Sequence, residues 1–206
     1  MKKIIAILFL SLLVGSDIAA QSMRSVFIQM PDTLMPLLTR TNREDCIDFI
    51  DAGMKARVTN RMEGKSELIT ISDDYIFLKT SDYASMQIKM LPCEKDTVIC
   101  IINSVCAEVC DSRISFYTKE WKRIGNEIYF NEPAIDDFFI KGEAVDTIAK
   151  MCDIRLVKLS MDPGNNTITA EYTMPTYMSN EDSARVAPHL QPIIFEWNGE
   201  RYNSRQ

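Results

Sequence analysis

Histidine is almost absent from this sequence, since His189 is the only one among 206 residues. It follows Pro188 in a segment that we expect to connect a helix to a strand, where a surface or capping role is the ordinary one. Nucleophilic triads need a base such as imidazole. The sequence also has no G-x-S-x-G elbow, Walker loop, dinucleotide fingerprint or H-E-x-x-H motif. These enzyme classes are therefore not indicated, and no cofactor is expected.

Clusters of basic residues are also missing. The chain has 23 basic and 29 acidic residues, which gives a formal net charge of −6. Phosphate backbones are bound by clustered Lys and Arg side chains. Nucleic acid is therefore not expected as a partner, and anionic membrane surfaces are disfavoured for the same reason.

Long hydrophobic runs are confined to the N-terminus. Lys2-Lys3 precede an apolar run from Ile4 to Val14, and small residues follow up to Ala20. The run is too short to span a bilayer, so residues 1–20 are predicted to be a secretory signal peptide that is cleaved near Ala20. The alternative is a membrane anchor that is never removed.

The predicted mature chain, residues 21–206, would carry 21 basic and 28 acidic residues and a formal charge of −7. It has no further apolar stretch of membrane-spanning length, and no cysteine stands at the cleavage site to carry a lipid. We therefore expect an exported protein, periplasmic or on the cell surface, that forms a single domain.

The six cysteines include no C-x-x-C pair, and no metal site is expected. Cys106 and Cys110 flank a short turn between two predicted strands and are the leading candidates for a disulfide. Pairing of Cys93 with Cys100 is a weaker candidate. Cys46, Cys100 and Cys152 lie in apolar segments, which is typical of buried free thiols.

The central part of the chain predicts an antiparallel meander, because its apolar runs are joined by short polar links. The expected strands are 68–71, 75–79, 86–91, 97–106 and 113–121. Strand 97–106 is apolar at both parities, so it should be covered on both faces. The fold class is therefore α+β, an antiparallel sheet packed against a few helices.

The N-terminal part predicts two helices. One is a short helix over 31–39 that Asp32 would cap. The other begins with Thr41-Asn42-Arg43-Glu44, which has the form of a capping box, and ends near Gly53. Residues 55–66 are polar and are expected to be a linker that turns at Gly64.

The C-terminal part predicts helix signals and further strands. The expected elements are a helix over 142–152, strands over 154–161, 167–174 and 193–197, a helix capped by Ser179, and a type I′ hairpin at Asn198-Gly199. A helix followed by strands thus occurs twice, which suggests a duplicated unit with halves 23–125 and 126–206.

Two sets of residues are candidates for a functional site. Aromatic side chains that dominate interface energetics are expected to line a sheet face or groove (Tyr117, Trp121, Tyr172, Trp197). The alternative is an acidic site among aromatic residues (Asp136, Asp137, with Glu132). Acid–base hydrolysis there would need two carboxyl groups about 5–10 Å apart.

Three segments (54–60 with 64–68, 105–107 with 111–117, and 196–202) carry a resemblance to an uncharacterised family of exported Bacteroidetes proteins, a domain of unknown function. The resemblance implies a periplasmic or cell-surface location and supplies no catalytic residues. The outline of helices and antiparallel sheet is also similar to the β-lactamase-inhibitor-protein type of fold, which typically binds proteins.

Exported proteins of that phylum can carry O-glycans on Ser or Thr that follows Asp and precedes an aliphatic residue. Four positions fit this pattern (Thr33, Thr97, Thr147, Ser183). The ordinary alternative is that Asp-Thr and Asp-Ser begin turns or cap helices.

The leading hypothesis is a non-enzymatic module of the cell envelope that binds an unidentified envelope protein or a small ligand. The alternative is a carboxylate-dependent hydrolase of glycans or peptides. A structural subunit of an envelope assembly is a third reading that the sequence does not separate from the first.

Overall fold

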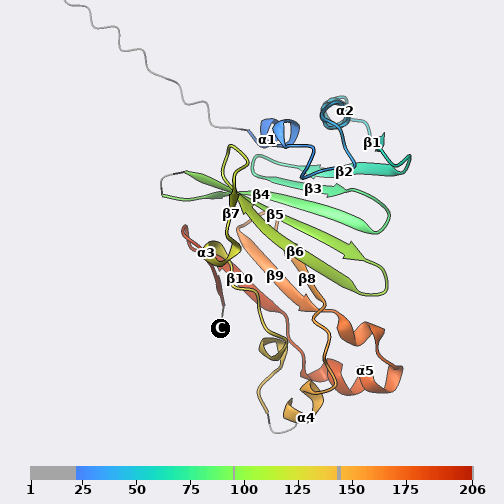
Figure 1. The fold of residues 1–206 in the computed structure, drawn as a ribbon, viewed down its shortest axis with the longest axis vertical. Coiled ribbons are helices and arrows are strands. Elements are labelled where there is room, and N and C mark those ends of the chain that lie inside the picture. The colour runs from blue at the N-terminus through green and yellow to red at the C-terminus, as the bar shows by residue number, and fades with distance from the viewer. Residues whose placement is uncertain (1–21, 95, 143–144, 206) are drawn as a thin grey trace, which may run out of the picture.

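The computed structural model describes residues 22–94, 96–142 and 145–205, and it contains two antiparallel sheets with helices at both ends of the molecule (Figure 1). The large sheet is a meander in which seven strands follow one another in chain order. They are β1 Ala56–Thr59, β2 Lys65–Ile71, β3 Tyr75–Lys79, β4 Ala84–Pro92, β5 Thr97–Cys106, β6 Cys110–Tyr117 and β7 Arg123–Ile124.

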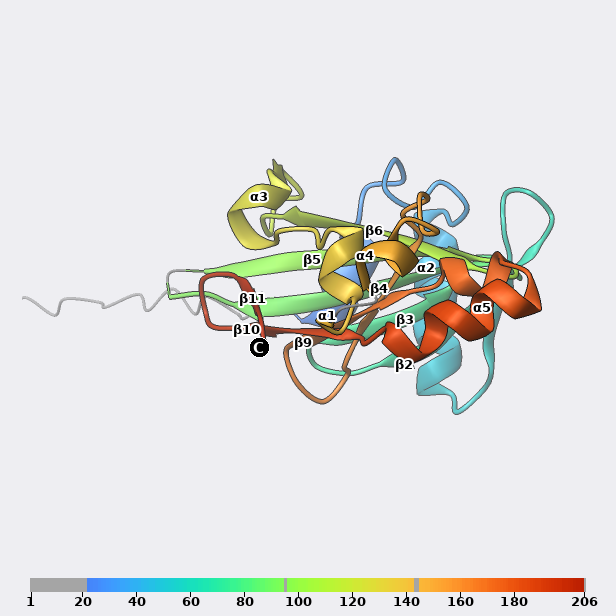
Figure 2. The ribbon, with the colours of Figure 1, turned by 90° about the horizontal axis from the view of Figure 1, so that it is seen from below.

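The small sheet has four antiparallel strands in the order β11-β10-β9-β8. They are β8 Val157–Met161, β9 Thr167–Tyr172, β10 Ile193–Trp197 and β11 Tyr202–Ser204. Figure 2 shows β10 and β11 beside the large sheet, with the turn between them pointing away from α5 (Asn180–Val186). The α+β class and the antiparallel meander are confirmed.

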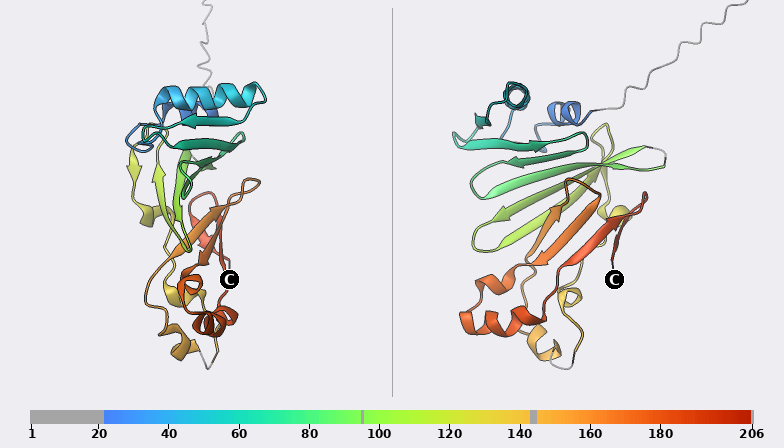
Figure 3. Two further views of the ribbon diagram at one scale, coloured as in Figure 1. Left: turned by 90° about the vertical axis from the view of Figure 1, so that its right-hand side faces the viewer. Right: turned by 180° about the vertical axis from the view of Figure 1, so that it is seen from behind.

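The large sheet lies between two hydrophobic layers. Helices α1 (Met23–Gln29) and α2 (Arg40–Asp51) cover one of its faces (Figure 3), and the small sheet packs on the other. Strand β5 shows the division, because Ile99 and Ile101 face the helices while Cys100 and Ile102 face the small sheet. Coverage on both faces is therefore confirmed for residues 98–102, whereas Asn103 and Val105 further along the strand are exposed.

The outer edge of β8 forms hydrogen bonds with side chains of the large sheet. The backbone N–H groups of alternate β8 residues donate to them, with Val157 bonded to Asp111 Oδ1 at 3.2 Å, Leu159 to Ser112 Oγ at 3.0 Å and Met161 to Gln87 Oε1 at 2.9 Å. This edge of the small sheet is therefore closed to further strands.

A buried lysine joins the two sheets at a second place. Lys89 of β4 is 1% exposed, and its ammonium lies 3.0 Å from the Asp74 carboxylate and donates to the carbonyl of Pro163 at 3.1 Å. Pro163 belongs to the β8–β9 turn, so this contact holds the turn against the large sheet.

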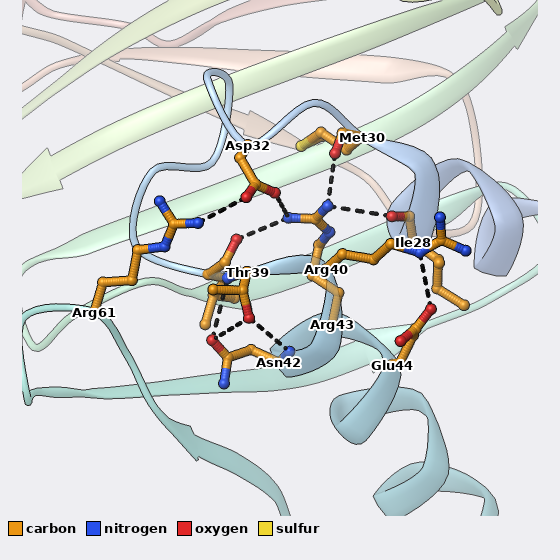
Figure 4. A network of polar contacts seen from close by, with 10 residues as sticks. Ile28, Met30, Asp32, Thr39, Arg40, Asn42, Arg43, Glu44 and Arg61 are labelled. Carbon is orange, nitrogen blue, oxygen red and sulfur yellow. Dashed lines mark hydrogen bonds and ion pairs between the residues drawn. The ribbon is translucent and has the colours of Figure 1, made fainter.

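A buried arginine organises the N-terminal layer (Figure 4). The guanidinium of Arg43 donates to three carbonyls and pairs with a carboxylate, at 2.8 Å to Leu38, 2.7 Å to Met30, 3.2 Å to Ile28 and 3.1 Å to Asp32. Arg61 binds the other oxygen of Asp32 at 2.7 Å. Arg43 therefore satisfies backbone carbonyls between α1 and α2 that would otherwise be buried without donors.

The expected helix over 31–39 is wrong, because these residues form turns. Pro36 lies inside the segment, where it lacks an N–H donor and disfavours helical geometry in the residue before it. The capping box is also displaced. Thr39 is the N-cap of α2, and its hydroxyl and the Asn42 side chain exchange hydrogen bonds with each other's backbone at 3.1 Å.

The expected linker over 55–66 is also wrong, since it contains β1 and the start of β2. Ala56 and Val58 of β1 are buried against the helices, which is the alternation of a half-covered strand. Asn60 closes the turn, because its Oδ1 accepts from the N–H groups of Met62 and Gly64 at 3.0 and 3.1 Å.

The β10–β11 hairpin turns one residue later than expected. Asn198 donates its backbone N–H to Arg201 at 3.2 Å, so the two loop residues are Gly199 and Glu200. Gly199 has φ +96°, whereas Glu200 does not have positive φ, a pattern typical of a type II′ turn rather than type I′. The side-chain oxygen of Asn198 accepts from the N–H groups of Glu200 and Arg201. These bonds fix Asn198 as the residue before the two-residue loop.

The remaining elements connect the sheets and cover their ends. They are α3 Asn126–Tyr129, α4 Val145–Ala149, and the 3-10 helices η1 Ile135–Phe138, η2 Met174–Tyr177 and η3 Ala187–His189. Ser179 caps α5 as predicted, accepting from Asp182 N–H at 3.1 Å. The large sheet ends at Ile124 and the small sheet begins at Val157. That the halves 23–125 and 126–206 are a repeat stays a prediction.

Candidate binding cleft

An open cleft of about 760 Å³ lies between the β10–β11 hairpin and residues 131–137. Four charged side chains line it (Glu132, Asp137, Arg201, Arg205), together with all three residues of β11. The volume is in the range of small-ligand and peptide sites. The cleft is therefore the candidate functional site.

The β11 wall is anchored by Tyr202. Its ring is buried and lies 5.2 Å from the ring of Trp197 and 6.2 Å from that of Phe130. Burial, with a smaller effect of the nearby Cys100 thiol, raises the pKa of Tyr202 far above its ordinary value. The phenol therefore stays protonated, and its part in the cleft is to fix the position of β11.

The opposite wall carries the two carboxylates. Glu132 forms an ion pair of 3.3 Å with Arg155, which also donates to the carbonyl of Pro133. Asp137 accepts from the backbone N–H of Ala134 at 2.8 Å and so caps η1. Both carboxylates therefore already have a polar partner.

Arg201 differs from the other charges of the cleft. Arg205 pairs with Glu196 at 3.0 Å, but among the described residues Arg201 has no ion pair. The Nε of Arg201 is buried and has no hydrogen-bond partner among them. A buried guanidinium N–H that lacks an acceptor is costly. Arg201 is thus the cleft cation that no described carboxylate neutralises.

The four aromatic candidates do not meet on one surface. Tyr117 and Trp121 lie on the helix side of the large sheet, with ring centroids 6.0 Å apart, and Tyr117 is buried. Tyr172 is buried on the other side and stacks on Phe138 at 5.8 Å.

Of the four, Trp197 lies closest to the cleft, because its ring packs against that of Tyr202 in the cleft wall. Its Nε1–H donates to the carbonyl of Pro92 at 2.7 Å. Trp121 has a different peculiarity. It adopts φ +63°, and its buried Nε1 has no partner among the described residues.

The acidic candidates are split. Asp137 and Glu132 line the cleft, whereas Asp136 is exposed outside it. Arg201 and Ser204 were not singled out from the sequence. No residue pattern marks them, because their position depends on strand register and on a wall that lies about 70 residues earlier in the chain.

A disulfide joins Cys106 and Cys110 across the β5–β6 hairpin, with the Cα atoms 4.1 Å apart. The other four cysteines are free thiols, and three of them are buried (Cys46, Cys100, Cys152). Cys93 is half-buried and is not paired with Cys100.

The candidate glycosylation positions differ in exposure. Thr33, in the turns before α2, and Thr147 of α4 are exposed, whereas Thr97 and Ser183 are half-buried. Modification at these hydroxyls stays a prediction.

Neither a metal centre nor a membrane-spanning helix is found within the described ranges. No group of three or more His, Cys, Asp or Glu residues there is arranged to hold a metal ion. The helices of this part of the chain are also too short or too polar to cross a bilayer.

Comparison with known proteins places the fold. A domain of an uncharacterized protein from Porphyromonas gingivalis W83 superposes with a TM-score of 0.76 at 23% identity, covering 88% of this chain and 96% of that one. A search of curated proteins finds no match. The model of the family described as "Protein of unknown function (DUF3256)" matches residues 16–202. The chain belongs to the DUF3256 family.

Proposed function

We propose that the protein is a non-enzymatic, exported module of the cell envelope that binds a protein or a small ligand through the cleft beside β11. The observation that carries this proposal is Arg201, which lines the cleft and has no ion pair among the described residues. Binding sites commonly combine a preformed hollow with a few such oriented polar groups.

Export is supported by two independent features. Residues 1–20 have the charge and hydropathy pattern of a signal peptide. The Cys106–Cys110 disulfide is typical of proteins that leave the reducing cytosol.

A carboxylate-dependent hydrolase is the second candidate, because Glu132 and Asp137 line the same cleft. A general acid usually keeps its proton through burial or a neighbouring like charge. Both carboxyl groups are instead exposed, with Arg155 beside Glu132 and a backbone N–H bonded to Asp137. This arrangement favours binding over hydrolysis.

The test is a capture experiment from an envelope extract of the native host, with the chain from Gln21 as bait and the affinity tag ahead of Gln21. Asn203→Trp should fill the cleft, because Asn203 is an exposed residue of its wall. Gln29→Trp is the matched control, since Gln29 is an exposed amide on α1.

The wild type and Gln29→Trp should recover the same specific partner, and Asn203→Trp should lose it. Equal recovery by all three proteins would show that binding does not use the cleft. Hydrolysis of glycan or peptide substrates by the wild type, abolished by Glu132→Gln or Asp137→Asn, would replace the binding proposal with the enzymatic one.

A further inference from the structure

The edge strands of the two sheets differ in how far their outer backbone groups are covered. Helix α2 lies along the outer edge of β1, where the Asn42 side chain donates to the carbonyl of Thr59. Strand β7 has only two residues, and the outer edge of β8 is bonded by side chains of the large sheet. Exposed edges are normally protected in such ways. Strand β11 is also short, with three residues, but within the described part of the chain no helix covers its outer edge and no side chain bonds it, and it borders the cleft.

The register of the hairpin shows which groups of β11 face that edge. Asn198 donates to the carbonyl of Arg201, and Arg205 donates to the carbonyl of Ile194 at 2.7 Å. Hydrogen-bonded residues alternate along an antiparallel strand. Arg201, Asn203 and Arg205 therefore bond β10, and the backbone N–H and C=O groups of Tyr202 and Ser204 point to the outer edge.

Arg201, the cleft cation without an ion pair in the described part of the chain, lies next to the outer edge of β11. Arg201 directly precedes Tyr202, the first residue of β11, and lines the same cleft. The other charged side chains of the cleft already have polar partners, with Arg205 held by Glu196, Glu132 by Arg155 and Asp137 by the backbone N–H of Ala134. A ligand that uses this site should therefore present backbone donors and acceptors together with one carboxylate.

We propose that the cleft binds an extended peptide segment that carries a carboxylate and adds to β11 as a further strand of the small sheet. The peptide backbone pairs with Tyr202 and Ser204, and the carboxylate pairs with Arg201. Main-chain hydrogen bonds supply affinity in such strand addition, and side-chain contacts supply specificity. This inference rests on the proposed function and names the ligand class.

The probe is a phage library of random decapeptides, panned against the chain from Gln21. Enriched peptides are synthesised in two forms, one with its Asp and Glu residues and one with Asn and Gln in their place. Affinities are measured by fluorescence anisotropy, and circular dichroism melting confirms that each protein variant is folded.

Ser204→Pro is the decisive variant, because it removes an outward N–H without touching the pairing with β10. It should weaken binding about tenfold or more, whereas Ser204→Ala, which keeps the N–H, should change it less than about twofold. Arg201→Gln should weaken binding of the acidic peptide about tenfold and leave its amide counterpart unchanged.

Absence of enriched peptides, or equal affinity of Ser204→Pro and wild type, would overturn strand addition. Equal effects of Arg201→Gln on the two peptide forms would overturn the role assigned to the carboxylate. A different result would distinguish failure of strand addition from failure of the proposed binding function. If Asn203→Trp abolishes capture of the envelope partner while Ser204→Pro does not, the cleft is a binding site but its ligand does not extend the sheet.

Discussion

The side chain of Gln87 bonds the backbone of Met161 as a neighbouring strand would. Its Oε1 accepts from the N–H of Met161 at 2.9 Å, and its Nε2 donates to the carbonyl of Leu159 at 3.3 Å. The two residues are 74 positions apart. One amide on the large sheet thus satisfies two buried groups on the edge of the small sheet.

Replacing Gln87 with leucine should lower the free energy of unfolding by about 3 kcal/mol, because two buried backbone groups lose their partners. Urea denaturation measures the change. Gln29→Leu makes the same substitution on the exposed face of α1 and should stay within about 0.5 kcal/mol. Similar losses in both variants would show that the sheet-to-sheet bonds contribute little.

Arg43→Met should destabilise the fold by about 3–5 kcal/mol, since it removes the donor shared by three carbonyls and leaves Asp32 without its buried partner. Arg61→Met removes the exposed partner of the same carboxylate and should cost less than about 1 kcal/mol. Guanidinium denaturation of both variants tests this contrast. A larger loss for Arg61→Met than for Arg43→Met would contradict the network in Figure 4.

Alkaline pH should unfold the protein more readily. Burial raises the pKa of the Cys46 thiol from 9.0 to about 11 and, with a smaller effect of Asp162, that of Tyr75 from 10.0 to about 12. The unfolded chain ionises these groups first, so their contribution is complete below pH 9 and is lost as pH rises toward 11 and 12. The decline from Cys46 should be about 1.4 kcal/mol per pH unit between pH 9 and 11.

Cys46→Ala provides the control for this pH dependence. It should lower the free energy of unfolding by about 1 kcal/mol at pH 7 through lost packing. Its decline between pH 9 and 11 should be shallower than that of the wild type. Parallel curves for the two proteins would show that Cys46 does not titrate as its burial implies.

Protein isolated from its native host should begin at Gln21. Ser22 caps α1 by accepting from the N–H of Ser25 at 3.2 Å, and Met23 is buried, so cleavage near Ala20 spares the first helix. Intact-mass spectrometry measures the start of the chain. A mass that includes residues 1–20 would favour the uncleaved anchor instead.

Glycosylation should be found at Thr33 and Thr147 rather than at Thr97 and Ser183, because only the first two side chains are exposed. The mass of protein from the native host should then exceed that of the unmodified chain, and Thr33→Ala with Thr147→Ala should remove the excess. An unmodified mass for the wild type would end this prediction.

Local patterns predicted much of the fold. The apolar run of β5 marked a strand covered on both faces, and the alternation in β9 placed Ile168 and Ala170 in the core. Ser179 marked the start of α5. These signals are readable because side-chain period and helix caps depend on residues only a few positions apart.

The sequence by itself determined the fold class, the central strands and the chemistry available to the chain. Only the tertiary structure decided which partners the polar side chains bond. Arg43 and Gln87 bond carbonyl and N–H groups remote in the chain, and the cleft brings residues 131–137 to β11. Such contacts follow from strand register and from the packing of one layer on another, which no local period records.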